Sequence, residues 1–329
     1  MLKLTSNINI GDYNFTFCNN VEVVSSWENL TDTARLVIPK NIRVKKDGIF
    51  TDAITSGSDA IWTRGDSVEI SLGYDNVNAA VFYGVLTKIS PKLPIEFECE
   101  DKMFILKQTT IPKLSETSVT LSSLMAAIVP ATINYETENI TIGKFVIENA
   151  SVAEVLNYLR KKFGIQSYFQ DDILYVGFAY RTSTINDIAT GDLKEFEFQK
   201  NIIDDSNLDY IRDDDVNLKV TAINILPNNT RTSKTVGNTL GEQRTLFFYN
   251  VTDAELTSLA NEALTKYKYE GFRGSFTTFL QPTVKHGQAV RVIDPIIPDR
   301  NGVYLVRQVV TRFGINGGRQ EITLDRKIA

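Results

Sequence analysis

The chain has 329 residues, which is enough for two or three domains, and 43% of them are hydrophobic, which is ample material for packed cores. Its formal net charge of −5 argues against a duplex nucleic-acid-binding protein, because such proteins usually carry a basic face. No apolar run reaches the roughly eighteen residues of a membrane-spanning helix, and the N-terminal segment lacks the apolar core of a signal peptide. We therefore expect a soluble, cytosolic chain without membrane insertion.

The first third of the sequence predicts a strand-rich domain over residues 1–110. Leu2–Ile10 and Tyr13–Phe17 alternate around Gly11-Asp12, which is a hairpin signal. The polar stretch Lys40–Ile61 predicts a long loop of the kind found at edges and interfaces. Prolines 91 and 94 mark a turn. The alternating segments that follow the hairpin predict a small barrel or sandwich, and they are Val21–Val24, Ala34–Ile38, Val68–Leu72, Val81–Ile89 and Ile95–Glu100.

The middle third predicts a small α+β module over residues 111–190. Apolar residues recur at helical spacing from Leu121 to Ile128, directly after Thr120. Ser151-Val152-Ala153-Glu154 is a capping-box pattern, in which the Ser oxygen accepts an N–H of the first turn while the Glu reaches back. Gly164 is a C-terminal stop for that helix, and Gln166–Phe178 reads as a hairpin.

The last third predicts a second β-barrel with one helix over residues 191–329. Thr252-Asp253-Ala254-Glu255 is a second capping box, and its helix is expected to end at Gly271. Residues Pro227–Glu242 are polar and predict a mobile loop, which becomes ordered around Gly237 and Gly241 on assembly. The expected strands are Glu195–Phe198, Asn217–Ile225, Thr245–Tyr249 and Phe272–Leu280.

The two ends of the chain contain a weak internal repeat. Arg64–Ile70 is echoed by His286–Val292, with a Gly followed at fixed spacing by two β-branched residues in each. The next strands correspond as Val85–Ile89 with Val309–Phe313, and then Ile95–Lys102 with Gln320–Lys327. Each copy reads as a Gly turn followed by three strands. Closed assemblies can be built from such repeated units.

The residues that carry chemistry give no catalytic, cofactor or metal site. The only histidine, His286, lies in a turn, where a solvated side chain is expected, and Cys18 and Cys99 are expected to be buried thiols. A zinc site built on His and Cys is nearly excluded. No phosphate-binding Gly loop is present. Arg64-Gly65-Asp66 reads as a turn into a strand, and the core is expected to take Phe82, Phe97, Phe196, Phe198 and Phe276.

One dense acidic run leaves two interpretations open. It is either an oxygen-ligand cation site, or else a solvated acidic loop or an acidic surface of an assembly, and its spacing lacks the loop pattern of a calcium-binding hand. Two carboxylates facing a cleft would also be required for glycoside hydrolysis, and nothing in the sequence marks such a pair. The run consists of Asp204, Asp205, Asp209, Asp213, Asp214 and Asp215.

The order of these elements resembles the baseplate hub proteins of long-tailed phages, the late control protein D group, and related contractile injection systems. Thr33–Pro39 after an N-terminal hairpin and the Ser151–Phe178 helix–hairpin module carry part of the resemblance. The C-terminal block carries the most specific part, and it comprises the Thr252–Tyr269 helix, Gly271–Leu280, Gly287–Val292, Gly302-Val303-Tyr304, and Val309–Phe313 with Gly317-Gly318.

The resemblance implies two tail-tube-like β-barrels per chain and a homotrimer with a pseudo-sixfold ring. Such hubs join the hexameric tail tube to a threefold central spike, which would here be a separate protein, and they contact other baseplate proteins. DNA would pass through the channel as cargo, and an acidic lumen would let it slide. The protein would be non-enzymatic, without cofactors, and would move from the host cytoplasm into the tail baseplate.

Two other readings remain open at the level of sequence. One is a carbohydrate-binding or glycan-hydrolysing tail protein that uses exposed aromatic residues and the acidic run. The other is a monomeric β-rich adhesion module, which predicts no ring and no second copy of the barrel.

Overall fold

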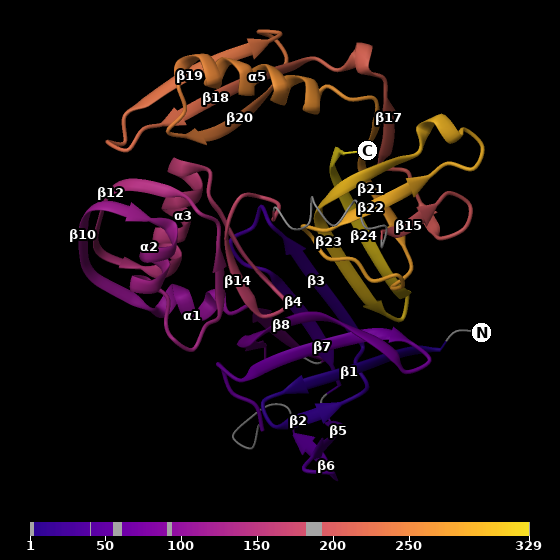
Figure 1. Cartoon of the computed structure of the whole chain (residues 1–329). Helices are drawn as coiled ribbons and strands as arrows, with labels where there is room; N and C mark the ends of the chain where they lie inside the picture. The colour runs from indigo at the N-terminus through magenta and orange to yellow at the C-terminus, as the bar shows by residue number, and fades with distance from the viewer. Residues whose placement is uncertain (1–2, 40, 55–60, 91–93, 182–192, 329) are drawn as a thin grey trace.

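One large, mostly antiparallel sheet includes strands from both ends of the chain (Figure 1). The computed structural model describes residues 3–39, 41–54, 61–90, 94–181 and 193–328. Strands dominate it, and a small α+β insert lies between two strand-rich units, so the predicted fold class is confirmed. Barrel closure of the two units stays a prediction.

The first unit packs its strands around a buried core. Trp62 is only 2% exposed, and its Nε1–H donates to the carbonyl oxygen of Ile10 over 3.1 Å. The hydrogen-bonded order of the strands is β4-β9-β8-β7-β1-β2-β5-β6, with β3 on the other side of β4. The bounds are β1 Leu4–Ile10, β2 Tyr13–Phe15, β3 Asn20–Ser26, β4 Thr33–Ile38, β5 Asn41–Lys46, β6 Ile49–Ile54, β7 Ser67–Tyr74, β8 Val77–Ser90 and β9 Ile95–Glu100.

The long loop expected at Lys40–Ile61 is wrong over most of its length, because β5 and β6 form a hairpin there. Ile42 and Val44 are buried at alternating positions of β5, and this short alternation suffices for a strand once a partner is present. Residues 55–60 of the expected loop and residues 91–93 of the expected proline turn lie outside the described part of the chain.

The second unit joins the same sheet through β23. The first half of β23 pairs with β22, and its second half pairs with β3 of the first unit, from Gln308 opposite Ser26 to Gly314 opposite Asn20. We call this β3–β23 pairing the seam. The bounds are β15 Lys194–Glu197, β16 Ile202–Asp204, β17 Leu208–Ile211, β21 Gly271–Thr278, β22 Ala289–Ile293, β23 Gly302–Gly314 and β24 Gly317–Lys327, with a 3-10 turn at Pro298–Arg300.

The internal repeat is confirmed in the hydrogen-bonding register of β7-β8-β9 and β22-β23-β24. The N–H of Gly65 donates to the carbonyl of Leu86 over 2.8 Å, and the N–H of Gly287 donates to the carbonyl of Val306 over 2.9 Å. Both glycines have a positive φ, which favours glycine. In each copy a β-bulge follows, between Leu86 and Lys88 and between Val306 and Gln308.

One strand of the predicted repeat is misaligned. The register makes Leu86 equivalent to Val306, so Val85–Ile89 corresponds to Leu305–Val309 and not to Val309–Phe313. The third strand keeps the predicted correspondence, because Cys99 lies opposite Leu86 and Leu324 lies opposite Val306. The error arose because β23 continues well beyond the repeated part, and its extension resembles the repeated strand in sequence.

The α+β insert has a core of its own, to which α2 and α3 contribute their apolar faces. The Ser151 capping box is formed, with Ser151 N–H donating to Glu154 Oε2 over 2.7 Å, and Gly164 ends the helix with φ of 70°. The bounds are α1 Met103–Gln108, β10 Thr110–Thr120, α2 Leu121–Ile128, β11 Tyr135–Thr137, β12 Thr141–Ser151, α3 Val152–Phe163, β13 Gln166–Gln170 and β14 Ile173–Gly177.

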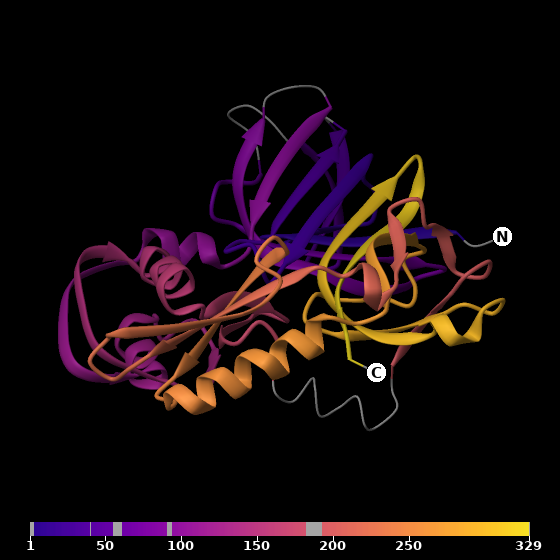
Figure 2. The ribbon, with the colours of Figure 1, turned by 90° about the horizontal axis from the view of Figure 1, so that it is seen from above.

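A separate three-stranded sheet lies between the insert and helix α5 (Figure 2). Phe248 of β20 packs toward α5, whereas Phe247 packs toward the insert, because neighbouring strand residues face opposite sides. The loop expected over Pro227–Glu242 is wrong over Arg231–Gly237, which forms a strand, and Gly241 packs against Leu218. The bounds are β18 Leu218–Ile225, β19 Arg231–Gly237, β20 Glu242–Tyr249 and α5 Asp253–Tyr267, after a 3-10 turn at Asp213–Asp215.

The expected domain boundaries at residues 110 and 190 place this sheet in the same domain as the second strand-rich unit. Strands β18–β20 pair with no strand of the large sheet in the described part of the chain. They contact the insert instead, where the Tyr249 hydroxyl donates to the carbonyl of Phe163, and Arg231 Nη2 donates to the carbonyl of Lys162 over 2.6 Å. The capping box at Thr252 is formed. Its helix ends at Tyr267 and not at Gly271 as expected, and Gly271 is the first residue of β21.

Candidate functional site

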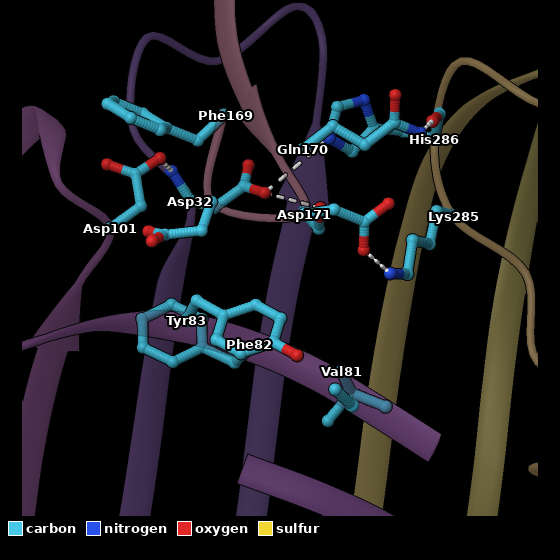
Figure 3. A pocket seen from close by; sticks show the side chains of 13 residues that line it. Asp32, Val81, Phe82, Tyr83, Asp101, Phe169, Gln170, Asp171, Lys285 and His286 are labelled. Atoms are coloured by element: carbon cyan, nitrogen blue, oxygen red, sulfur yellow. Dashed lines mark hydrogen bonds and ion pairs between the residues drawn. The ribbon is translucent and has the colours of Figure 1, made fainter. Parts of the chain in front are cut away.

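The first unit, the insert and the second unit meet at one polar site, which is partly buried (Figure 3). Loops before β4 and after β9 come from the first unit, and the tip of the β13–β14 hairpin comes from the insert. The segment before β22 comes from the second unit. We call the following residues the junction: Ser25, Asp32, Asp101, Gln170, Asp171, Lys285 and His286.

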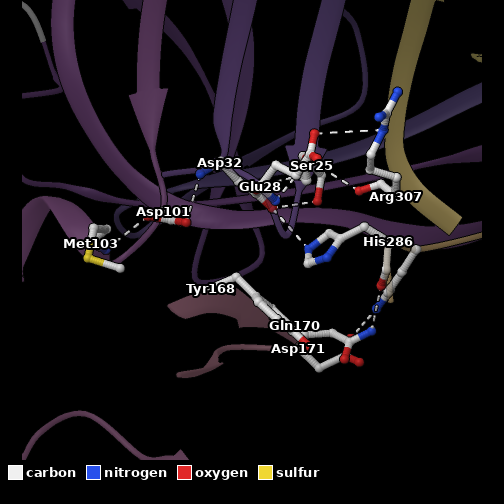
Figure 4. Close-up of polar contacts among 12 residues, drawn as sticks. Ser25, Glu28, Asp32, Asp101, Met103, Tyr168, Gln170, Asp171, His286 and Arg307 are labelled. Carbon is white, nitrogen blue, oxygen red and sulfur yellow. Dashed lines mark hydrogen bonds and ion pairs between the residues drawn. The ribbon is translucent and has the colours of Figure 1, made fainter. Parts of the chain in front are cut away.

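Two aspartates of the junction are bonded to each other (Figure 4). The N–H of Asp32 donates to Asp101 Oδ2 over 2.8 Å, and the N–H of Met103 donates to Asp101 Oδ1 over 2.9 Å. The carboxylate of Asp32 accepts the hydroxyl of Ser25 and, over 3.0 Å, the N–H of Ser26. Burial raises the pKa of Asp101 well above its usual value, and the charge of Asp32 raises it further.

His286 lies directly beside this pair. Its side chain is 2% exposed, its Nε2 is 3.6 Å from Asp32 Oδ2, and its ring meets that of Tyr168 edge-on at 4.9 Å between centroids. The prediction of a solvated histidine is therefore wrong, since the sequence shows the turn but not the hairpin that covers it. Ser25 donates to Asp32 and not to His286, so these groups do not have the order of a nucleophile triad.

The junction connects the insert to the second unit. Gln170 Nε2 donates to the carbonyl of His286 over 3.2 Å, and Lys285 Nζ forms an ion pair with the carboxylate of Asp171. The cavity here has a volume of about 50 Å³, far below the several hundred cubic ångströms of a ligand pocket. The site is therefore suited to holding three parts of one chain together.

A second contact joins the same three parts. Trp27 Nε1–H donates to the hydroxyl of Tyr180 over 2.9 Å, and that hydroxyl donates to Asp325 Oδ2, also over 2.9 Å. These residues belong to the loop after β3, the segment after β14, and β24. No sequence motif predicts this chain of bonds, because its members lie far apart along the chain.

The acidic run lies away from the junction, on exposed strands and turns. Asp204 ends β16, Asp209 lies in β17, and the last three aspartates form the 3-10 turn before β18. Asp204 accepts the N–H of Ser206 over 2.9 Å. The described residues contain no group of three or more His, Cys, Asp or Glu side chains placed to hold a metal ion.

The other residues selected from sequence have structural places. Cys18 and Cys99 are buried free thiols, as predicted. Arg64-Gly65 forms the turn before β7, also as predicted. The phenylalanines expected in the core are buried or pack against it, and they are Phe82, Phe97, Phe196, Phe198 and Phe276.

The seam is a further feature that the sequence did not indicate. Arg312 of β23 bonds Glu22 of β3 and Glu321 of β24, each over 2.9 Å. It therefore links three adjacent strands that come from both ends of the chain. The alternating strands were predictable, but their partners were not, because strand pairing across nearly the whole chain leaves no local pattern.

Among the exposed apolar side chains of the strand-rich units, one pair lies at the end of the seam and another on a hairpin. A groove of about 530 Å³ lies beside Phe17 and Ile315, which are 61% and 97% exposed, at one end of the seam. The β5–β6 hairpin carries Ile49 and Phe50, which are 72% and 60% exposed. Patches of this kind mark interaction surfaces in many proteins. No helix in the described ranges is long and apolar enough to cross a membrane.

No family model and no curated protein matches this sequence. Several solved structures, however, are similar to it in fold. A tail protein from Neisseria meningitidis MC58 matches with a TM-score of 0.64 and 17% identity, over 99% of this chain and 97% of that one. The 43 kDa tail protein of prophage MuSo2 from Shewanella oneidensis matches with a TM-score of 0.60 and 14% identity, over 98% of both chains.

A third similar structure comes from a secretion system. It is the E. coli c3393 protein, a component of the type VI secretion system, with a TM-score of 0.52 and 10% identity, over 99% of this chain and 76% of that one. The chain described here therefore has the fold of phage tail proteins and of a type VI secretion component, and this fold extends over nearly its whole length.

Proposed function

We propose that this protein is the structural hub of a phage or phage-like tail. The observation that carries the proposal is the internal repeat, in which the same three-strand unit occurs twice with the same turn and the same bulge. The shared fold with tail proteins supports it.

The repeat gives the hub its geometric role. A homotrimer of a chain with two equivalent units presents six similar units around one axis, which matches a hexameric tail tube on one side. Its true symmetry remains threefold, which suits a threefold central spike on the other side. The tube, the spike and other baseplate proteins are its proposed partners, and DNA or an effector is the cargo that passes through the channel.

The proposed location follows from that role. The chain would assemble in the host cytoplasm and then reside in the tail baseplate. The acidic run does not favour the glycan-binding alternative, because its residues are exposed and spread over separate elements. The junction cavity is also too small for a sugar.

The solution mass tests the proposal. Light scattering should give the mass of three chains, and negative-stain images of the same peak should show a ring with an open centre and a nearly sixfold outline. A monomer at every concentration, which also forms no ring after addition of tube or spike protein, would contradict the hub.

A further inference from the structure

The seam joins two equivalent units within one chain, and it therefore offers a template for the joint between chains. In the seam, β3 of the first unit lies along the second half of β23 of the second unit. The pairs at its start are Gln308 opposite Ser26, Val309 opposite Ser25, and Val310 opposite Val24. If a ring alternates the two units, each first unit must also meet the second unit of a neighbouring chain.

The register identifies the strand that corresponds to β23. Because Leu86 is equivalent to Val306 and the bulges coincide, Lys88, Ile89 and Ser90 of β8 correspond to Gln308, Val309 and Val310. In β23 those three positions pair with β3 on the side away from β24. In β8 the same three positions pair with β9 on one side, and their other edge pairs with no strand in the described ranges.

The register also identifies the counterpart of β3. Leu36 of β4 lies opposite Phe97 of β9, and Phe276 of β21 lies opposite Ile322 of β24, so β21 corresponds to β4. The strand beyond β4 is β3, and the strand beyond β21 at the same height is β17.

This correspondence extends to single residues. Val24 lies opposite Thr33 of β4, and Asp209 lies opposite Arg273, the residue of β21 that corresponds to Thr33, so Asp209 corresponds to Val24. Within the described residues, β17 pairs only with β21, and its outer edge is open.

We propose that β17 of one chain pairs antiparallel with the second half of β8 of the next chain, which repeats the seam between subunits. This inference rests on the proposed trimer and specifies its interface. The expected register places Ser90 opposite Asp209, Ile89 opposite Tyr210, and Lys88 opposite Ile211. Joining these edges would remove two open strand edges from each chain.

Charge and length both bear on this joint. The seam carries the ion pair of Glu22 with Arg312, and the new joint would bring the ammonium group of Lys88 diagonally toward the carboxylate of Asp209. The connection from Ser90 to Ile95 is shorter than the equivalent connection from Val310 to Gln320, so it has fewer residues for an extension like the one that lengthens the seam. The subunit joint is therefore the shorter of the two.

Paired cysteines test the register. The variant Ser90→Cys/Asp209→Cys should form disulfide-linked chains under mild oxidation, up to the mass of a trimer, and reductant should return them to monomers on a gel. The single variants should not form these species. Cys18 and Cys99 will not interfere, because both are buried and burial raises their thiol pKa values, to about 11 and about 12.

A matched control lies in the seam itself. The variant Val24→Cys/Val310→Cys occupies the equivalent positions within one chain, and it should close an intrachain disulfide without changing the mass. This control shows that the register permits the bond and that chains with two added cysteines fold.

The outcomes separate this inference from the proposed function. If light scattering gives a trimer and the seam control closes, but the Ser90/Asp209 variant forms no link between chains, the proposed joint is wrong and the ring stands. If the chain forms no trimer, alone or with tube and spike protein, the hub is contradicted and the joint falls with it. A reducible covalent trimer supports both.

Discussion

At the scale of single residues, stability depends on buried polar groups whose partners come from distant parts of the chain. Asp101 is 2% exposed and holds two backbone N–H groups, yet its carboxylate lies beside that of Asp32. The folded protein therefore keeps a carboxyl group whose charge is unfavourable where it lies. This arrangement makes stability depend on pH.

Because burial raises the pKa of folded Asp101 well above the usual 3.8, the folded protein binds more protons than the unfolded chain at pH values between these two pKa values. The stabilising contribution of Asp101 is therefore complete below pH 3.8, and it is lost as the pH rises through the pKa that Asp101 has in the folded protein. We expect Asp101→Asn to cost the most stability at low pH, and the cost to shrink as pH rises. Urea unfolding of both proteins from about pH 4 to pH 8 measures this difference, and a constant difference would contradict it.

Gln320 provides a second prediction at this scale. It is 1% exposed, accepts the N–H of Val284 over 3.0 Å, and donates to the carbonyls of Phe279 and Pro282 over 2.8 and 3.1 Å. Gln320→Leu would leave the buried N–H of Val284 and the part-buried carbonyls of Phe279 and Pro282 without these partners, so we expect a loss of about 2 kcal/mol or more in the free energy of unfolding.

The control for this variant is Gln243→Leu, at an exposed position of β20. It should change the free energy of unfolding by no more than about 0.5 kcal/mol, as surface substitutions usually do. Equal effects of the two variants would show that the bonds of Gln320 do not stabilise the fold.

Single residues also show what the sequence could tell about the candidate site. The buried thiols and the turn at Gly65 were predictable, because each depends on its own neighbours in sequence. The burial of His286 was not, since the covering hairpin is more than a hundred residues away, at Gln170. The surroundings of a residue could not be predicted from sequence where its contacts come from a distant part of the chain.

At the scale of elements, the capped helices and the alternating strands followed from local pattern. Ser151 and Thr252 mark helix starts through hydrogen bonds within four residues, so the sequence contains the whole signal. Strand β19 was missed because Val236 is its only large apolar residue and all of its residues are exposed or half-buried. Only pairing with β18 makes this segment a strand.

The contact between the insert and the β18–β20 sheet gives a prediction about Gly164. A Cβ on Gly164 would lie 2.2 Å from the ring of Phe247, and the residue has φ of 70°. Gly164→Ala therefore adds a clash between elements to the cost of a left-handed alanine, which is about 1–2 kcal/mol. We expect its destabilisation, measured by urea unfolding, to exceed that cost by about 1 kcal/mol or more.

Gly48 is the matched control for the backbone term. It also has a positive φ, of 85°, and a Cβ there would meet nothing within 4 Å. Gly48→Ala should therefore show only the left-handed cost. If the two substitutions destabilise the protein equally, Phe247 yields to the new methyl group and the contact is not tightly packed.

At the scale of the whole molecule, the chain combines an acidic net charge of −5 with a proposed role as a channel for DNA. A conduit must not hold its cargo, and binding to duplex DNA depends on basic groups that displace counterions. We therefore expect no retardation of duplex DNA in a gel at physiological salt up to about 10 µM protein, a range in which basic non-specific binders retain DNA. Retardation that weakens steeply with salt would contradict this expectation.

The seam also has a consequence for how the chain is made. Ser26 and Arg307, which are bonded across it, lie 281 positions apart, so β3 leaves the ribosome long before β23 exists. Such distant pairing forms slowly, and during synthesis the edge of β3 is available to any other strand. Nascent chains on one messenger RNA are the nearest source of such strands, and mispairing at this edge is the expected route to aggregation. Co-expression with a chaperone that binds nascent chains should therefore raise the soluble yield. A lower growth temperature that is applied only after synthesis should raise it less.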